Sequence, residues 1–262
     1  MQFDAYQRIF GNLQGYANRI CLYILGEPLL NPDVFKIISH TEQLGIPTIV
    51  STNGMLIGEH LLRILDSGLS YIQVAIDGWS QKSHAAHRAG ADLEQIVSSV
   101  SQLHKERERL GLRNPTITIQ SLVNKLNQDQ LGDIEAFARI RADHFTLKKM
   151  MLGRTEKAVK RNRQVFEPDD ARYQRTGCAA SFYRDMPICP QLLQINVLVN
   201  GSVVPCCFDF DGTHVWGNLL DQPLSDILTG RPRKEFMLDF FRKRSQLCLR
   251  CDFVQDMQIG IF

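Results

Sequence analysis

Between Ile20 and Lys149 the chain alternates between short apolar runs and longer stretches in which apolar residues recur at every third or fourth position. A short apolar run is typical of a buried strand, and the longer period is typical of a helix with one buried face. The predicted strands are Ile20–Leu25, Thr48–Thr52, Tyr71–Ile76, Thr116–Leu122 and Phe145–Lys148. The predicted helices between them are Asp33–Leu44, Glu59–Ser67, Leu93–Leu110 and Gln128–Ile140.

Strict alternation of strand and helix predicts parallel strands joined by right-handed crossovers, and therefore an α/β fold. About five such units are too few for a closed eight-stranded barrel, so an open barrel or a doubly wound sheet is expected. The clearest boundaries surround the first of these helices. Asn31 suits the N-cap, Pro32 suits the first helical position, and Gly45 suits the C-terminal stop.

The pattern changes after Met150, where the alternation stops. Two apolar segments further on, Gln194–Val199 and Ser202–Val204, flank Asn200-Gly201, which is a strong signal for a two-residue hairpin turn. Asp226–Arg244 has the spacing of a helix. The sequence therefore predicts three regions, with a larger α/β region at 1–150, a linker at 151–187 and a small hairpin-plus-helix region at 188–262.

Composition narrows the class of protein only slightly. The chain has 262 residues, 44% of them hydrophobic, and a formal net charge of +2, so its charge indicates neither a nucleic-acid nor a membrane partner. The first residues lack the pattern of a signal peptide, and no apolar run has the length of a membrane span. We therefore expect a reducing, cytoplasmic compartment, where the seven cysteines serve as ligands or buried thiols.

Four of these cysteines have the spacing of a metal centre. Cys189 and Cys206 bracket the hairpin as C-x11-G-x4-C, and Cys248 and Cys251 form C-x2-C. Because a tight turn folds the two hairpin strands together, Cys189 and Cys206 are expected at the same end of the hairpin. A thiolate cage of this kind holds either a zinc ion or an iron–sulfur cluster.

Other assignments of these thiols remain open. Cys207 adjoins Cys206 and is an alternative ligand, although neighbours on a strand point to opposite faces. The cysteines could also pack as small apolar side chains without binding metal. Cys21 and Cys178 are predicted to be spare thiols, and His214 is predicted to be a surface residue.

Polar residues follow several predicted strands. Gly26, Glu27 and Pro28 follow the first strand, where Gly26 permits close approach of a ligand and the carboxylate of Glu27 can accept hydrogen bonds from an ammonium group. Later strand ends carry Asn53, Asp77, Gln120 and Lys148, and Arg88 comes shortly after Asp77. In parallel α/β folds, functional groups gather at this edge of the sheet.

A basic stretch lies between Arg154 and Arg163. Such a charge run is usually a solvated face. An RNA-binding surface is the alternative interpretation, and it predicts salt-dependent affinity for RNA.

The motifs in this order resemble those of the radical S-adenosylmethionine (radical SAM) enzymes. The first part carries GEPLLNP, STNG and AIDG, and the last part carries VPCC, WGN and LCLRC, which resemble a SPASM-type auxiliary-cluster domain. The resemblance implies a partial radical SAM barrel followed by a small cluster domain. It also implies that Gly26, Glu27 and Pro28 contact the methionine amino group of S-adenosylmethionine, with Asn53, Asp77 and Arg88 nearby.

The same resemblance assigns an auxiliary [4Fe-4S] cluster to Cys189, Cys206, Cys248 and Cys251. It implies a 5′-deoxyadenosyl radical that abstracts hydrogen from a peptide or small-molecule substrate, and an electron donor such as a flavodoxin or ferredoxin. The alternative is a zinc-stapled, non-catalytic binding module on an α/β scaffold.

One feature of the family is missing from this sequence, the C-x3-C-x2-C loop that binds the catalytic cluster. Where the family has Ser-Ile-Asp-Gly, Ala75 replaces the serine, and Leu25 stands where a second glycine usually precedes Gly26. The expected explanations for the missing loop are a truncated start or a degenerate relative that keeps only the auxiliary cluster.

Overall fold

The computed structural model describes residues 1–262 except 154–155, 175–187, 250, 252–259 and 262. Contacts divide the chain into two compact units, which are described separately below. The larger, here called the sheet unit, comprises Asn18–Leu152, Val159–Arg175 and Asp256–Phe262. The smaller, here called the cysteine unit, comprises Met1–Ala17, Gly153–Ala158 and Thr176–Gln255.

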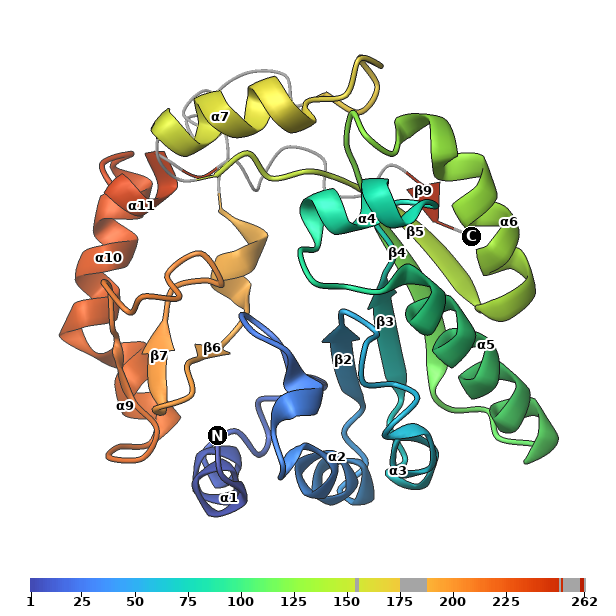
Figure 1. The fold of residues 1–262 in the computed structure, drawn as a ribbon. Coiled ribbons are helices and arrows are strands. Elements are labelled where there is room, and N and C mark those ends of the chain that lie inside the picture. Colours follow the sequence, from blue (N-terminus) through green and yellow to red (C-terminus); the bar gives the residue numbers. More distant parts are fainter. Residues whose placement is uncertain (154–155, 175–187, 250, 252–259, 262) are drawn as a thin grey trace. The chain divides into compact units, whose positions relative to one another are not determined.

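The sheet unit is built on strands that lie side by side in their order along the chain. They are β1 (Ile20–Cys21), β2 (Thr48–Thr52), β3 (Tyr71–Ala75), β4 (Thr116–Val123) and β5 (His144–Lys149), all parallel, followed by β9 (Gly260–Ile261) antiparallel to β5. A doubly wound sheet reverses its strand order, whereas this sheet does not. The arrangement is that of a partial β/α barrel wall (Figure 1).

Helices follow each parallel strand of this unit. They are η1 (Pro28–Leu30), α2 (Val34–Gln43), α3 (Leu61–Asp66), α4 (Gln81–His87), α5 (Leu93–Arg109), η2 (Gln128–Gln130), α6 (Leu131–Arg141) and α7 (Glu156–Phe166). Helix α5 illustrates why they form. Asp92 caps it by accepting a hydrogen bond from the Gln95 backbone at 3.0 Å, and its buried residues recur at three- and four-residue spacing.

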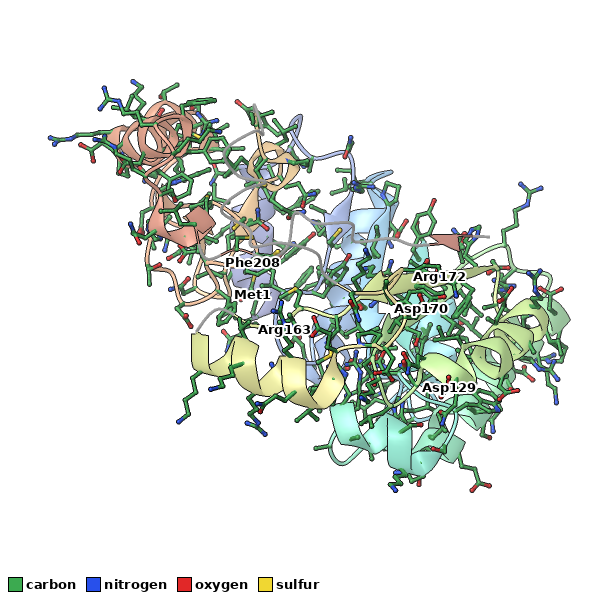
Figure 2. All side chains as sticks on the ribbon, turned by 90° about the horizontal axis from the view of Figure 1, so that it is seen from above. Met1, Asp129, Arg163, Asp170, Arg172 and Phe208 are labelled. Atoms are coloured by element: carbon green, nitrogen blue, oxygen red, sulfur yellow. The ribbon has the colours of Figure 1, made fainter. Side chains whose placement is uncertain are left out.

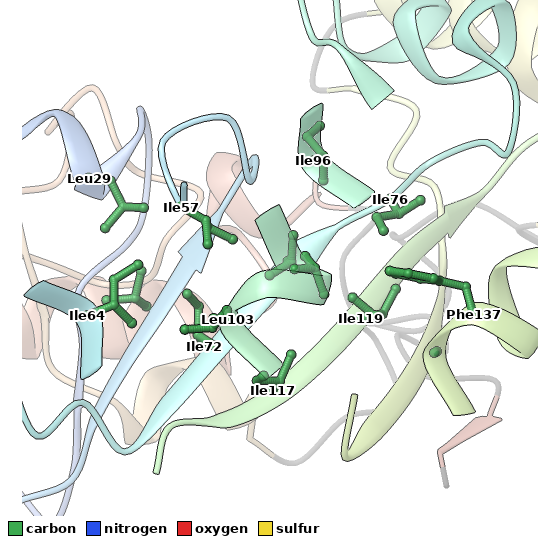
Figure 3. Packing of buried hydrophobic residues seen from close by; sticks show 14 of the residues in the cluster. Leu29, Ile57, Ile64, Ile72, Ile76, Ile96, Leu103, Ile117, Ile119 and Phe137 are labelled. Atoms are coloured by element: carbon green, nitrogen blue, oxygen red, sulfur yellow. The ribbon is translucent and has the colours of Figure 1, made fainter. Parts of the chain in front are cut away.

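The core of the sheet unit lies between one face of the sheet and these helices. Ile72 and Ile117 from neighbouring strands pack with Ile96 and Leu103 of α5, and none of the four is exposed to solvent (Figure 3). Alternate strand residues point to this core because side chains on a strand alternate between faces. The remaining strand residues therefore form a second face, which is largely polar.

The cysteine unit contains a small antiparallel sheet and several short helices. The strands are β6 (Asn196–Val197), β7 (Ser202–Val204) and β8 (Gly217–Asn218), and the helices are α1 (Phe3–Gly11), η3 (Pro190–Leu193), α9 (Leu224–Thr229), α10 (Arg231–Phe241) and α11 (Gln246–Leu249). The predicted hairpin is confirmed, but its two-residue turn is not. Asn196 pairs with Val204, and the backbone of Leu198 donates a hydrogen bond to the carbonyl of Ser202, so the turn holds Val199, Asn200 and Gly201. The turn needs glycine because Gly201 has φ of +86°.

Helix α1 packs against the core of the cysteine unit although it is far away in sequence. Ile9 and Leu13 are buried in the same cluster as Phe240. The side chains of Arg8 and Asn12 donate hydrogen bonds of 2.9 Å to the carbonyl oxygens of Leu220 and Leu219, respectively. The sequence pattern did not predict this helix, since its apolar face gives no indication of so distant a partner.

Several predicted boundaries are wrong. The strand predicted as Ile20–Leu25 ends at Cys21, because the chain turns away to reach Gly26 at φ of +80°. Helix α2 begins at Val34, and Asn31 accepts a hydrogen bond from the Asp33 backbone in the preceding turn instead of capping the helix. The helix predicted as Gln128–Ile140 begins with the 3-10 segment η2.

The helix predicted as Asp226–Arg244 is also wrong, because it is divided into α9 and α10 at Gly230, whose backbone is extended. Strands β8 and β9 were not predicted, since two residues carry too little pattern to be recognised. No helix among the described residues has the length and apolar character needed to cross a membrane.

Candidate functional site

The loop after β1 is held by the carboxylate of Glu27. Oε1 accepts a hydrogen bond from the Leu29 backbone at 3.1 Å, which caps η1, and Oε2 accepts one from the Asn53 backbone at 2.8 Å. Gly26 is exposed and Pro28 is half-buried beside it. Glu27 therefore ties the first strand-end loop to the end of β2, with Gly26 on the surface next to it.

The turn after β2 depends on Asn53 and Gly54. The side chain of Asn53 accepts a hydrogen bond from the Met55 backbone at 2.9 Å. Gly54 has φ of +87°, and a Cβ atom there would lie 2.8 Å from Cγ2 of Ile96 and 3.0 Å from Cγ1 of Val74. Any other residue at position 54 would clash with the core. Asn53 and Gly54 therefore fix the backbone conformation of the turn that follows β2.

Asp77, directly after β3, is a fully buried carboxylate with several donors. Its Oδ2 accepts from Nε of Arg88 at 2.7 Å and lies 3.1 Å from Nδ1 of His87, and its Oδ1 accepts from the Leu122 backbone at 2.7 Å. Burial alone would raise the pKa of Asp77, but the hydrogen bond with His87 and the charge of Arg88 hold it below its ordinary value. The carboxylate is therefore ionised.

His84 and His87 belong to this group although sequence analysis did not single them out. His84 is fully buried, and its Nδ1 accepts a hydrogen bond from the Asp77 backbone at 3.1 Å. Burial lowers the pKa of His84, which favours the neutral ring that accepts this bond. The signal that could have found them is their spacing with Arg88, because residues three and four apart share one face of α4.

The structure thus brings the predicted residues of the sheet unit together in two pairs. Glu27 contacts Asn53, and Asp77 contacts Arg88. Among the described residues, no hydrogen bond or ion pair joins one pair to the other. Both pairs follow neighbouring parallel strands, so they lie at the same edge of the sheet.

The candidate ligand cysteines all lie in the cysteine unit. Cys189 precedes η3, Cys206 follows β7, Cys248 lies in α11, and the backbone of Cys251 donates a hydrogen bond to the carbonyl of Cys248 at 3.2 Å. Burial, with the charges of the nearby Cys207, Cys251 and Cys248, raises the pKa of the Cys206 thiol to about 12. Cys206 therefore has both cysteines of the C-x2-C pair as electrostatic neighbours.

Cys207 has different surroundings. Burial and the neighbouring Cys189 raise the pKa of its thiol, and its Sγ lies 3.8 Å from Oε1 of Gln191. Cys178 lies outside the described residues, and Cys21 is exposed in the sheet unit. Cys248 and Cys251 thus act on the pKa of Cys206, whereas Cys189 acts on that of Cys207.

The thiol of Cys189 is half-buried directly before η3. Burial raises the pKa of Cys189, while backbone N–H groups of Gln191 and Leu192 hydrogen bond to its sulfur and act in the opposite direction. Backbone donors to sulfur are typical of iron–sulfur sites. Among the described residues, no three or more His, Cys, Asp or Glu side chains are grouped closely enough to hold one metal ion.

The loop after Cys206 and Cys207 is organised by Asp209, a residue that sequence analysis missed. Asp209 is fully buried, its backbone donates to the Cys206 carbonyl at 3.1 Å, and its Oδ2 accepts from the His214 backbone at 2.8 Å. His214 lies partly exposed against Phe236, with ring centroids 5.5 Å apart. A buried aspartate with backbone donors has no signature in the sequence pattern.

The basic stretch falls mostly on α7, where Lys157, Lys160 and Arg161 are exposed. Arg163 pairs with Glu167 at 3.2 Å, and on the segment after α7 Asp170 accepts from Arg172 at 2.6 Å (Figure 2). Glu167, directly after the helix, pairs with one of its basic residues, and solvent exposure of the others is the usual arrangement for such a charge run.

The fold and the cysteine pattern define a protein with a partial β/α barrel and an iron–sulfur domain. A family model described as "Radical SAM superfamily" matches residues 3–138, and one described as "Iron-sulfur cluster-binding domain", named SPASM, matches residues 189–252. Because the first match alone covers half of the chain, the protein belongs to the radical SAM superfamily. It carries a SPASM domain, and domains of this type bind iron–sulfur clusters.

Individual relatives agree with this family. A probable GTP 3′,8-cyclase of Methanocaldococcus jannaschii is 22% identical over 237 residues, which cover 82% of this chain and 74% of the relative. An AdoMet-dependent heme synthase of Nitratidesulfovibrio vulgaris is 30% identical over 122 residues, 45% of this chain and 33% of the relative. Several other curated relatives are matched over 24% to 39% of their own length.

Among solved structures, BtrN in complex with AdoMet and 2-DOIA superposes with a TM-score of 0.57. The sequence identity is 18%, and the match covers 100% of this chain and 86% of BtrN. At this identity the similarity shows the shared fold.

Proposed function

We propose that this chain is a radical SAM/SPASM protein that binds an auxiliary [4Fe-4S] cluster and that, in its complete form, modifies a peptide or a small molecule by hydrogen abstraction. The observation that carries the proposal is the match of residues 189–252, which include all four of the spaced cysteines, to an iron–sulfur cluster-binding domain. Cys206 also has Cys248 and Cys251 as electrostatic neighbours. In the proposed site, Cys189, Cys206, Cys248 and Cys251 hold an auxiliary [4Fe-4S] cluster. Burial raises the pKa of the Cys189 and Cys206 thiols, so binding of a cationic metal core would release protons from them.

The proposed site for S-adenosylmethionine lies at the edge of the sheet unit. Exposed Gly26 leaves backbone accessible, and the carboxylate of Glu27, fixed by two backbone donors, offers further lone pairs to an ammonium group. Arg88 supplies a cation for a carboxylate, although it already pairs with Asp77. Asn53 and Pro28 are the remaining residues of this proposed binding site. Reductive cleavage of S-adenosylmethionine supplies a 5′-deoxyadenosyl radical.

That cleavage needs a catalytic cluster, which the family holds with a C-x3-C-x2-C loop. No such spacing occurs in the present sequence. We therefore propose that this chain by itself binds the auxiliary cluster and S-adenosylmethionine, and that turnover depends on cysteines that this sequence does not supply. An electron donor such as a flavodoxin or ferredoxin is part of the same proposal.

Metal analysis of anaerobically reconstituted protein tests the cluster. The expected result is a brown protein with about four iron and four sulfide per chain, lost in Cys206→Ala and Cys251→Ala. The control is Cys21→Ala, because Cys21 is an exposed thiol in the sheet unit. A colourless protein with one zinc per chain would contradict the proposal and support a zinc-stapled binding module.

A further inference from the structure

The second face of the sheet carries a row of hydrogen-bonding side chains that the proposed cofactor sites do not use. On β3, β4 and β5 the residues that point away from the apolar core include Gln73, Thr118, Gln120, Thr146 and Lys148. Their direction follows from alternation, since Ile119, Phe145 and Leu147 between them pack into the core. Register places Gln120 opposite Thr146 and Leu122 opposite Lys148.

Lys148 is the charged member of this row, and it is half-buried. It makes no hydrogen bond or ion pair with any residue that the structure describes. Burial is the single cause that lowers the pKa of its amine. Because a desolvated ammonium group without a counter-ion is destabilising, an anion bound beside Lys148 would offset this cost.

The neighbouring side chains offer donors and no competing charge. Gln120 and Thr146, on the same face, also make no side-chain hydrogen bond with described residues. None of the β1–β5 residues on this face is Asp or Glu. Asp77 at the end of β3 is already held by Arg88, His87 and the Leu122 backbone. A negative charge brought to this face would therefore meet a cation that pairs with none of the described residues, next to two neutral donors.

We infer that Lys148, with Gln120 and Thr146, binds an oxyanion group, a carboxylate or a phosphate, of the small molecule on which the enzyme acts. The inference rests on the proposed function and specifies its substrate class. Lys148 is the next-to-last residue of β5, close to the carboxyl edge of the parallel strands, where ligands of such folds bind. A lysine serves as a point charge for either oxyanion, and the amide and hydroxyl groups donate hydrogen bonds that orient it.

Pyridoxal 5′-phosphate is a suitable probe, because its aldehyde condenses with a neutral amine, releasing water, while its phosphate mimics the ligand. Cyanoborohydride then transfers hydride to the imine and fixes the label for peptide mass spectrometry. At about pH 8, below the ordinary lysine pKa of about 10.4, Lys148 should label several times faster than the exposed Lys105. Inorganic phosphate or succinate should slow labelling of Lys148 and leave Lys105 unchanged.

Protection by phosphate alone assigns a phosphate-bearing substrate, and protection by succinate alone assigns a carboxylate. Protection by neither, or equal labelling of the two lysines, overturns the inference. A thermal shift with the effective oxyanion provides a second readout. It should vanish in Lys148→Met, weaken in Gln120→Leu and persist in Lys148→Arg and Lys105→Met.

Cluster content and binding of S-adenosylmethionine are measured on the same samples. Lys148→Met is expected to keep both. If the unsubstituted protein lacks both while Lys148 is labelled and protected, the proposed function fails and the oxyanion site stands. If it has both but Lys148 is not protected, the oxyanion site alone is wrong.

Discussion

The carboxylate of Glu27 accepts a hydrogen bond of 2.8 Å from the backbone of Asn53, so two strand-end loops that are 26 residues apart share one side chain. Glu27→Ala leaves this donor and that of Leu29 without their partner. The expected loss in the free energy of unfolding is about 1–3 kcal/mol, measured by urea denaturation.

Glu27→Gln separates the structural role from binding. An amide keeps an oxygen for one backbone donor but loses the charge that would pair with an ammonium group. We expect calorimetry to show weaker binding of S-adenosylmethionine in this variant than in the control Glu94→Gln, which removes an exposed carboxylate at the start of α5. Equal affinities would remove Glu27 from the proposed binding site.

Asp77→Asn should be among the most destabilising substitutions in the sheet unit. It leaves Arg88 without its partner at 2.7 Å and removes the charge that meets His87. Breaking a buried pair costs about 3 kcal/mol or more. The matched control is Glu135→Gln, which removes an exposed pair with Arg139 on α6 and should change stability by about 0.5 kcal/mol or less. Similar losses in the two variants would contradict this assignment.

Acid should remove the stabilisation that Asp77 provides. Its pKa in the folded protein lies below the ordinary value of 3.8, so the contribution is complete above pH 3.8 and is lost as pH falls through the folded-state value. The free energy of unfolding, followed by circular dichroism, should therefore decrease more steeply below pH 3.8 for the unsubstituted protein than for Asp77→Asn. Parallel curves would show that Asp77 is not the group responsible.

Serine substitution distinguishes the adjacent thiols. Cys206 has Cys248 and Cys251 as electrostatic neighbours, whereas Cys207 has Cys189. Cys206→Ser is therefore expected to abolish iron binding, and Cys207→Ser to retain most of it. Iron and sulfide analysis after anaerobic reconstitution decides between them, and the opposite pattern would make Cys207 the ligand.

Gly201→Ala tests whether the hairpin positions Cys189 and Cys206. A Cβ atom there would lie 2.5 Å from Oδ1 of Asn218, in a backbone conformation with φ of +86°. The left-handed conformation alone costs about 1–2 kcal/mol, and the cluster should dissociate faster under chelator. Gly132→Ala in α6 is the control, because nothing lies within 4 Å and alanine favours helices by about 1 kcal/mol. Faster cluster loss from the control would indicate a general effect.

The sequence pattern predicted the interior of the sheet better than its borders. Thr48–Thr52 matches β2, and the strand predicted as Tyr71–Ile76 exceeds β3 by one residue. Such strands are long enough for their apolar residues to be recognised. Among the described residues, strand β1 pairs with β2 alone and has two residues. The apolar residues after Cys21 were therefore wrongly assigned to the strand.

For the candidate site, residue types and positions were predictable, but their contacts were not. Asp77 and Arg88 were both expected near a cosubstrate, and their pairing with each other depends on the turn between β3 and α4. The partners of Glu27 are backbone N–H groups, which every residue except proline possesses. A sequence therefore does not reveal which of them a carboxylate will meet.

The packing of α1 has a consequence for synthesis of the protein. Ile9 and Leu13 belong to a cluster whose other members include Leu192, Leu219 and Phe240, so a ribosome makes this helix long before its partners exist. The sheet unit consists mostly of one continuous stretch and can begin to fold during translation. Until these partners are made, the apolar side of α1 is exposed. Chains whose synthesis stops before residue 192 should therefore bind a chaperone more strongly than complete chains do.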